Sequence, residues 1–245
     1  MARVETVSYD TWEQLKSELF KQLYQEPRFR PDEYLFRGQA RGDWSLVPSF
    51  DRWYRTWGRG RDRVALSEEF VATFLSACED QGHDIGVGPG DLAAVALAQH
   101  YGVPTRLLDW SESPYVAAFF AFQNYLQLEA DPFETVAIWA LNRRAECWTP
   151  ASGIEVLRTP RVANIRLRNQ YGLFTLSKST AAGLEEAVRA ASWDGVALWR
   201  ILLPSNNAAV ALSDLAAMGL SPARLFPELE GAAAAARQRL ILPTL

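Results

Sequence analysis

The sequence predicts an α+β fold in which a mixed or antiparallel sheet is flanked by helices. Segments with helical periodicity gather early in the chain, strand-like segments gather late, and the two kinds do not alternate regularly. The chain has 245 residues, of which 49% are hydrophobic, so a packed core is expected. No linker-like or repeated segment divides it. We therefore expect a single domain over residues 1–245, with a core of roughly residues 30–230.

Helices are predicted where apolar side chains recur at intervals of three and four residues. The first has Asp10 as its cap and Glu13 at the spacing of a capping box. Another begins with Ser113 as its cap and Pro114 at the first helical position. The predicted helices span residues 8–23, 66–78, 91–99, 113–128, 183–191, 205–218 and 221–237.

Strands are predicted for short runs that are aromatic, β-branched or alternating. Glycine and proline bound several of these runs: Gly38 follows the first, and Pro48 and Pro204 end two others. The predicted strands and extended segments span residues 34–37, 44–47, 105–109, 135–141, 164–177 and 196–203.

Composition excludes several classes of protein. A net charge of −4 argues against a general nucleic-acid coat, although a local basic patch is compatible with it. Cys78 and Cys147 lie far apart, and His83 and His100 lack metal-ligand spacing, so neither disulfides nor a metal site are expected. The first residues lack a signal peptide's apolar core, and no run reaches the length of a membrane span. We expect a cytoplasmic protein without membrane contact.

Residues 98–122 place a polar cluster between two apolar helical segments. Core packing does not require such residues, and polar groups at the ends of rigid elements are typical of functional sites. Trp110 offers a face for stacking near the positive end of the following helix, whereas Asp109 or Ser111 can instead cap that helix. His100 can equally be a histidine stabilised at a helix C-terminus. The candidates are His100, Thr105, Arg106, Asp109, Trp110 and Ser111. Thr105 and Arg106 can contact phosphate or pair with Asp109.

A second polar cluster ends the aromatic strand at residues 34–37. Arg37 is followed by Gly38 and Gln39, so its planar guanidinium can reach a phosphate or carboxylate with no neighbouring side chain in the way. The alternative is a buried arginine that pairs with a carboxylate such as Asp109 and holds two elements together.

Two further cationic segments have two interpretations each. Alternation places Arg166, Arg168 and Gln170 on one face of a late strand, which faces either solvent or a ligand. Residues 52–63 interleave arginine with aromatic residues. They can grip nucleic acid by phosphate contact and base stacking, or form a solvated helical face with cation–π contacts.

The chain resembles the FRG domain, a bacterial domain named for its Phe/Tyr-Arg-Gly element. Phe36-Arg37-Gly38 matches that element, and the segments at residues 99–102 and 104–110 match the family's central block. Asn169-Gln170 with Gly172 resembles a later strand, and Leu225-Phe226-Pro227 resembles the C-terminal end. The resemblance spans nearly the whole chain, but by itself it implies no particular activity.

A weaker resemblance, in the order of elements, is to ADP-ribosyltransferases. These enzymes have an arginine on an early strand, a Ser-Thr-Ser strand end before a helix, and a glutamate on a late strand. Arg37, Ser111 and Gln170 fall at the corresponding places. Gln170 departs from the pattern because it lacks the charge that stabilises the oxocarbenium-like transition state. Either another acid such as Asp109 or Glu155 supplies that charge, or the domain binds a nucleotide without transferring it.

These resemblances imply a nucleotide cleft that uses NAD, in a toxin or anti-phage defence effector with an ADP-ribosyltransferase-like core. The implied catalytic residues are Arg37, Asp109, Ser111 and Gln170. The implied cofactor-binding residues are Arg37, Gln39, His100, Thr105, Arg106, Trp110 and Arg168. The alternative is a non-catalytic module that binds a nucleotide, a nucleic acid or a protein partner. A third interpretation makes Arg37 and Asp109 a structural ion pair without a ligand.

Overall fold

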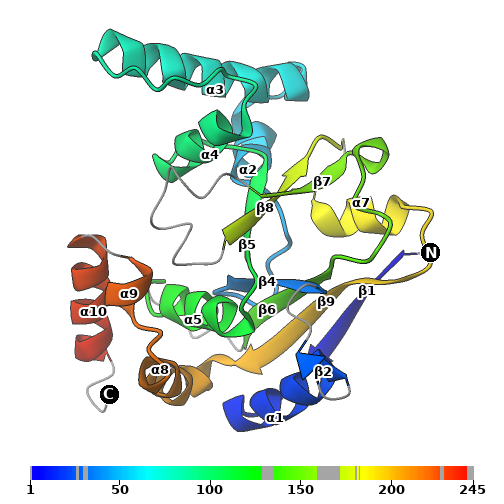
Figure 1. Ribbon diagram of the computed structural model, residues 1–245, viewed down its shortest axis with the longest axis vertical. Helices are drawn as coiled ribbons and strands as arrows, with labels where there is room; N and C mark the ends of the chain where they lie inside the picture. Colours follow the sequence, from blue (N-terminus) through cyan, green and yellow to red (C-terminus); the bar gives the residue numbers. More distant parts are fainter. Residues whose placement is uncertain are drawn as a thin grey trace.

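The computed structural model describes residues 2–25, 28–29, 33–128, 135–158, 172–179, 181, 183–226 and 229–241. The strands are β1 (Ala2–Ser8), β2 (Tyr24–Gln25), β3 (Arg28–Phe29), β4 (Tyr34–Gln39), β5 (Leu107–Ser111), β6 (Thr135–Asn142), β7 (Ile154–Leu157), β8 (Gly172–Ser177) and β9 (Gly195–Pro204). A 7-stranded sheet has the order β1-β9-β6-β4-β5-β8-β7 (Figure 1). The pair β1–β9 is parallel, the neighbouring pair β9–β6 is antiparallel, and the predicted α+β class with a mixed sheet is confirmed.

Helices flank this sheet along the chain. They are α1 (Trp12–Leu23), α2 (Ser49–Trp57), α3 (Arg63–Asp80), α4 (Leu92–His100), α5 (Pro114–Tyr125), α7 (Leu184–Ala190), α8 (Ala208–Ala217), α9 (Pro222–Leu225) and α10 (Leu229–Ile241). Short 3-10 turns occur at Pro150–Ser152 and Ser205–Asn207. No helix in the described part of the chain is long and apolar enough to cross a membrane.

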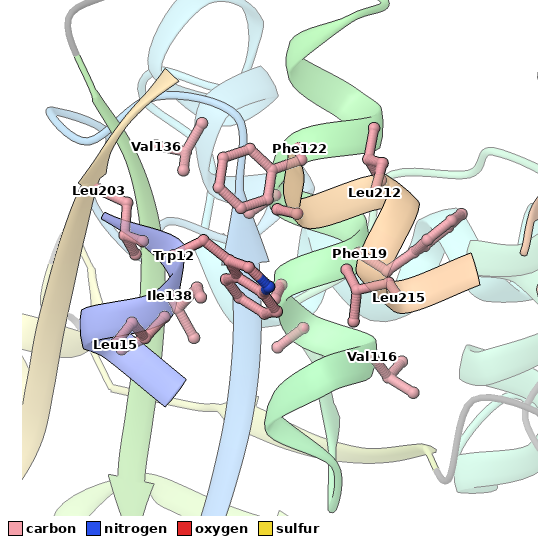
Figure 2. Packing of buried hydrophobic residues seen from close by; sticks show 14 of the residues in the cluster. Trp12, Leu15, Val116, Phe119, Phe122, Val136, Ile138, Leu203, Leu212 and Leu215 are labelled. Carbon is pink, nitrogen blue, oxygen red and sulfur yellow. The ribbon is translucent and has the colours of Figure 1, made fainter. Parts of the chain in front are cut away.

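The main core lies between the sheet and the helices α1, α5 and α8. Figure 2 shows Trp12 of α1 inside this core, where its ring meets Phe122 of α5 edge to face, with 6.2 Å between the ring centroids. The one polar atom of the Trp12 ring is satisfied, because Nε1 donates a hydrogen bond to Asp214 of α8 at 2.7 Å. Each large apolar side chain buried here contributes about 1.5–3 kcal/mol relative to exposure, which explains why α1 docks on the sheet.

The opposite face of the sheet is covered by α7 and by the segment that follows β4. Leu46 of that segment is fully buried, and its backbone N–H donates to both carboxylate oxygens of Glu185 in α7, each at 3.0 Å. This charge-assisted contact joins the helix to a segment 139 residues earlier in the chain. Leu35 and Trp139 from the sheet lie in the same core.

The helices α2, α3 and α4 form a group beside the end of the sheet, and α3 lies farthest from it in Figure 1. Their contacts are made by aromatic and small apolar residues. Phe50 of α2 meets Phe70 of α3 edge to face at 6.0 Å. Val71 and Leu75 of α3 pack on Ala94 and Ala98 of α4. The group is therefore held by a small core of its own.

The sheet splits between β4 and β5. A single pair, Phe36 with Ser111, joins these strands, whereas β4 pairs with β6 through six consecutive residues from Tyr34 to Gln39. Beyond Phe36 the two strands diverge. Figure 1 shows β7 and β8 on one side of β5 and the strands β4, β6, β9 and β1 on the other. The backbone groups that a regular ladder would pair are thus left along the split for side chains or ligands.

Local sequence signals predicted most elements correctly. Ser113 accepts a hydrogen bond from Val116 N and Pro114 begins α5, as the capping pattern indicates. The first prediction is wrong at its start, because residues 2–8 form β1 and the helix begins only at Trp12. The extended segment at residues 44–47 joins no sheet, and β7 was not predicted. The predicted strand at residues 164–177 is described only from Gly172.

Candidate functional site

Arg37 reaches across the split in the sheet. Alternation along β4 sends Phe36 into the core under α5 and leaves Arg37 on the other face. Its Nη1 donates a hydrogen bond to the backbone oxygen of Asp109 at 2.8 Å, and the same nitrogen lies 3.6 Å from Asp109 Oδ2. Arg37 therefore supplies, from a side chain, a contact between β4 and β5 at the place where their backbones separate.

Gly38 is required by the packing of α5 against β4. A Cβ atom at this position would lie 1.9 Å from Ala117 O and 2.5 Å from Ala121 N, both backbone atoms of α5. The helix thus crosses β4 directly over the glycine. The sequence argument that Gly38 leaves room for a ligand beside Arg37 is wrong, since the space belongs to the helix.

Asp109 is held by a short chain of polar side chains. Gln99 of α4 donates from Nε2 to Asp109 Oδ1 at 2.7 Å, and its Oε1 accepts a hydrogen bond from the hydroxyl of Thr105. The side chain of Asp109 is 56% exposed, whereas that of Arg37 is 22% exposed. Asp109 therefore presents a positioned carboxylate to solvent beside a half-buried guanidinium.

Gln99 was missed as a site residue by the sequence argument. It lies in the segment of residues 99–102 that resembles the FRG family, and this was the signal that singled it out. Its role became visible only when the turn after α4 brought it next to Asp109, ten residues later. Thr105 acts through Gln99, and it is buried because its backbone also pairs with Ser49 and Phe50.

The guanidinium of Arg37 has an unsatisfied donor. Its Nε is buried and has no hydrogen-bond partner among the described residues. Buried polar groups are nearly always paired, so such an atom marks a place where a ligand or water belongs. The surroundings are cationic: local desolvation and, after it, the charge of Arg37 lower the pKa of Arg52, although Arg52 as a whole is exposed.

Arg106 does not join this site. It is 4% exposed, its Nε lies 4.0 Å from Asp51 Oδ1, and its Nη2 donates to Ser179 O at 2.7 Å. Asp51 also receives a hydrogen bond from Arg63 Nε at 2.7 Å. The predicted phosphate contact or pairing with Asp109 is wrong, because Arg106 is enclosed in a buried ion cluster that joins β5, α2 and α3.

Trp110 and Gln39 are structural. Trp110 is 2% exposed and its Nε1 donates to Thr175 Oγ1 at 3.0 Å. The stacking role predicted for it is wrong, because the core covers its ring. Gln39 is buried too: its Oε1 accepts from Trp139 Nε1 at 2.7 Å and its Nε2 donates to Ser45 O at 3.3 Å. Both groups of this amide are used internally, which leaves it no capacity for a cofactor.

The remaining candidates lie at different distances from Arg37 along the chain. Ser111 is buried opposite Phe36, where the split begins, and accepts a hydrogen bond from Ser113 N at 3.1 Å. His100 is exposed at the end of α4, with its ring edge-on to Tyr101. Arg168 and Gln170 lie outside the described residues, so their predicted roles stay predictions. No group of metal-binding side chains occurs in the described part of the chain.

The cationic segment at residues 52–63 is partly used for internal contacts. Arg61 pairs with Glu69, and Trp53 packs edge-on against Phe70 with 4.6 Å between ring centroids. Trp57 is 72% exposed, and Arg59 is exposed beside it on the same segment. This surface is compatible with both the nucleic-acid and the solvated-helix interpretation.

Comparison with known proteins adds a family. A model of the FRG domain matches residues 32–130, which contain β4, α2, α3, α4, β5 and α5. The matched segment therefore includes Arg37, Gln99 and Asp109, the residues that meet at the split. Comparisons with curated proteins and with solved structures gave no match. Residues 32–130 of this chain belong to the FRG domain family.

Proposed function

We propose that the split between β4 and β5 binds a nucleotide and that Arg37 binds its phosphate groups. The observation that carries this proposal is the buried, unpaired Nε of Arg37 beside the exposed carboxylate of Asp109. A guanidinium that is held at one nitrogen and free at another matches the paired oxygens of a phosphate. The chain thus provides a fixed cation where the sheet opens.

The hydrogen bonds around Asp109 support this interpretation. The carboxylate lies 3.6 Å from Arg37, beyond a good hydrogen bond, and is held at 2.7 Å by Gln99 instead. Arg37 is therefore not fully used by a structural ion pair. An entering phosphate can bind the guanidinium while Gln99 keeps Asp109 beside it.

We propose further that the nucleotide is NAD and that the domain transfers ADP-ribose, as the order of elements suggests. In such a reaction the bond between the ribose C1′ and nicotinamide breaks, and nicotinamide leaves with the electron pair. An acceptor nucleophile then bonds to C1′ and loses a proton. Asp109 is an exposed acid at the split and would stabilise the positive charge that develops on the ribose. Consumption of NAD in this way suits a toxin or an anti-phage defence effector.

Thermal unfolding with NAD, ADP-ribose, ATP and a short RNA tests the binding proposal. NAD or ADP-ribose at about 100 times its Kd should stabilise the wild type by about 2.7 kcal/mol. Arg37→Ala should remain folded and lose this stabilisation. The matched control is Arg61→Ala, which removes an exposed arginine from an ion pair on α2 and α3 and should respond as the wild type does.

Two results would count against the proposal. If no nucleotide stabilises the wild type, the split does not bind nucleotides. If folded Arg37→Ala keeps the full response, the ligand binds elsewhere. For the transfer step, release of nicotinamide from NAD is measured with macromolecular acceptors present. Unchanged NAD together with retained binding would leave a binding module without transferase activity.

A nucleic-acid module is the second candidate. The observation that favours it is the exposed Trp57 beside the exposed Arg59. Aromatic rings next to cations are typical of surfaces that stack bases and contact phosphates. Stabilisation by the RNA alone, decreasing as salt rises, would select this candidate over the nucleotide site.

A further inference from the structure

A polar hollow of about 280 Å³ lies on the face of the sheet that carries Arg37, but at a different place. Its floor comes from the sheet: Thr6 of β1, Arg200 of β9 and Trp139 of β6. Its walls come from α7, from α2 and from the segment that follows β4. Segments from both ends of the chain therefore build it, and Arg37 is not among its lining residues.

The floor is a row of side chains in register across the strands. Thr6 is opposite Arg200, Arg200 is opposite Trp139, and Trp139 is opposite Arg37. Residues directly opposite one another project to the same face, so one row connects the hollow to the split. Arg37 and Arg200 are two strands apart, or roughly 10 Å, so one small anion cannot bridge them.

Arg200 is held in an orientation that leaves donors available. Its guanidinium carbon lies 5.6 Å from the centroid of the Trp139 ring, and its Nε donates a long hydrogen bond to Thr6 Oγ1 at 3.4 Å. Among the described residues, no carboxylate lies within ion-pair distance of Arg200 or of Arg189 on α7. A stacked arginine without an acid partner presents its remaining N–H groups at the mouth of the hollow.

The charges that line the hollow favour an anion. Three arginines and two glutamates line it, which gives a net charge of +1. One of the acids, Glu185, is buried and committed to the backbone N–H of Leu46. The other pair of opposite charges, Arg55 and Glu186, already have partners, so Arg189 and Arg200 carry the uncompensated charge.

We infer that this hollow is a binding site for a small phosphorylated molecule, which Arg189 and Arg200 hold by its phosphate. The planar fork of arginine matches phosphate oxygens, and the polar lining disfavours an apolar ligand. The volume is at the low end of the range for ligand pockets, roughly 300–1,000 Å³, which suits a small ligand rather than a whole dinucleotide. The inference is independent of the nucleotide site at Arg37.

Calorimetric titration with inorganic phosphate at constant ionic strength tests this site. The wild type should bind phosphate, and Arg189→Gln should weaken binding about tenfold or more, as expected for loss of a charged hydrogen bond. Arg200→Gln should do the same. Because Arg200 also stacks on Trp139, the exposed Arg189 provides the variant that leaves the fold intact. Arg61→Gln is the matched control and should bind as the wild type does.

The variant Arg37→Ala separates the two sites. Phosphate binding that remains in this variant should disappear when Arg189→Gln is added. Three results would overturn the inference: no phosphate binding by the wild type, equal affinity in folded Arg189→Gln and the wild type, or loss of all binding in Arg37→Ala alone. The last result would assign phosphate to the split, whereas failure of NAD to bind there would leave this inference untouched.

Discussion

Three consecutive residues of β4 illustrate how single side chains define the site. Phe36 is buried under α5, Arg37 faces the opposite side of the sheet, and Gly38 lies beneath the backbone of α5. Each has a different reason to be the residue it is. An apolar ring fills the core, a guanidinium bridges the split, and the absence of a Cβ admits the helix. The Phe-Arg-Gly element is therefore a packing motif that also fixes the position of a cation.

Gly38→Ala should strongly destabilise the fold. The added methyl group would overlap Ala117 O at 1.9 Å, and neither strand nor helix can move without disturbing the core. We expect a loss of about 3 kcal/mol or more in the free energy of unfolding by urea. Gly90→Ala is the control: a Cβ there meets nothing within 4 Å, so it should be neutral or slightly stabilising. Equal stabilities for the two variants would contradict the close approach of α5.

At the scale of elements, α1 and α8 are joined through one carboxylate. Asp214 of α8 accepts hydrogen bonds from Trp12 Nε1 and from Lys16, both of α1. The bond from Lys16, and after it the bond from Trp12, lower the pKa of Asp214. A lowered folded-state pKa means that the ionised form stabilises the fold. The contribution is complete above the ordinary pKa of 3.8 and is lost as the pH falls through the folded-state pKa.

Asp214→Asn should therefore cost about 1 kcal/mol near neutral pH, since the amide keeps an acceptor for Trp12 but loses the charge that faces Lys16. The difference in unfolding free energy between wild type and variant should shrink as the pH falls below about 4, where the wild-type carboxylate is protonated. Urea unfolding from pH 3 to 7 measures it. Asp80→Asn, at the exposed end of α3, is the control. A difference independent of pH would contradict an ionic contribution.

At the scale of the whole molecule, a buried ion cluster connects the helical group to the sheet. Asp51 of α2 contacts Arg63 of α3 and Arg106 beside β5. Both arginines also donate to the carbonyl of Ser179, which follows β8. Burial raises the pKa of Asp51 even though the charge and hydrogen bond of Arg63 oppose the shift. The cluster therefore holds parts of the chain together while the candidate site lies a few residues away.

Asp51→Ala should cost about 3–5 kcal/mol, because it leaves two buried guanidinium groups without their carboxylate. Equilibrium unfolding in urea measures the loss, and an unchanged m-value would show that two-state behaviour is kept. The comparison is Glu69→Ala, which breaks the exposed pair with Arg61 and should cost no more than about 1 kcal/mol. Similar losses for both variants would contradict a buried role for Asp51.

The sequence predicted those features that depend on neighbours along the chain. Ser113 and Pro114 mark the start of α5, and the uninterrupted run at β6 predicts a strand, because caps and propensities act over a few residues. Arg37 and Asp109 were correctly singled out as partners, because both follow apolar runs that end in polar residues. The match to the FRG domain likewise rests on short blocks within residues 32–130.

Tertiary structure alone decided which side chains reach the site. Alternation places a residue on one face of a strand but does not state what covers that face, so Trp110 became core and Arg106 became part of a buried cluster. The pairing of β1 with β9 joins residues nearly the whole chain apart, and no local pattern contains it. Gln99 reaches Asp109 only through the turn after α4. Local sequence determines the elements, whereas burial and pairing depend on segments that are distant in sequence and meet only in the folded protein.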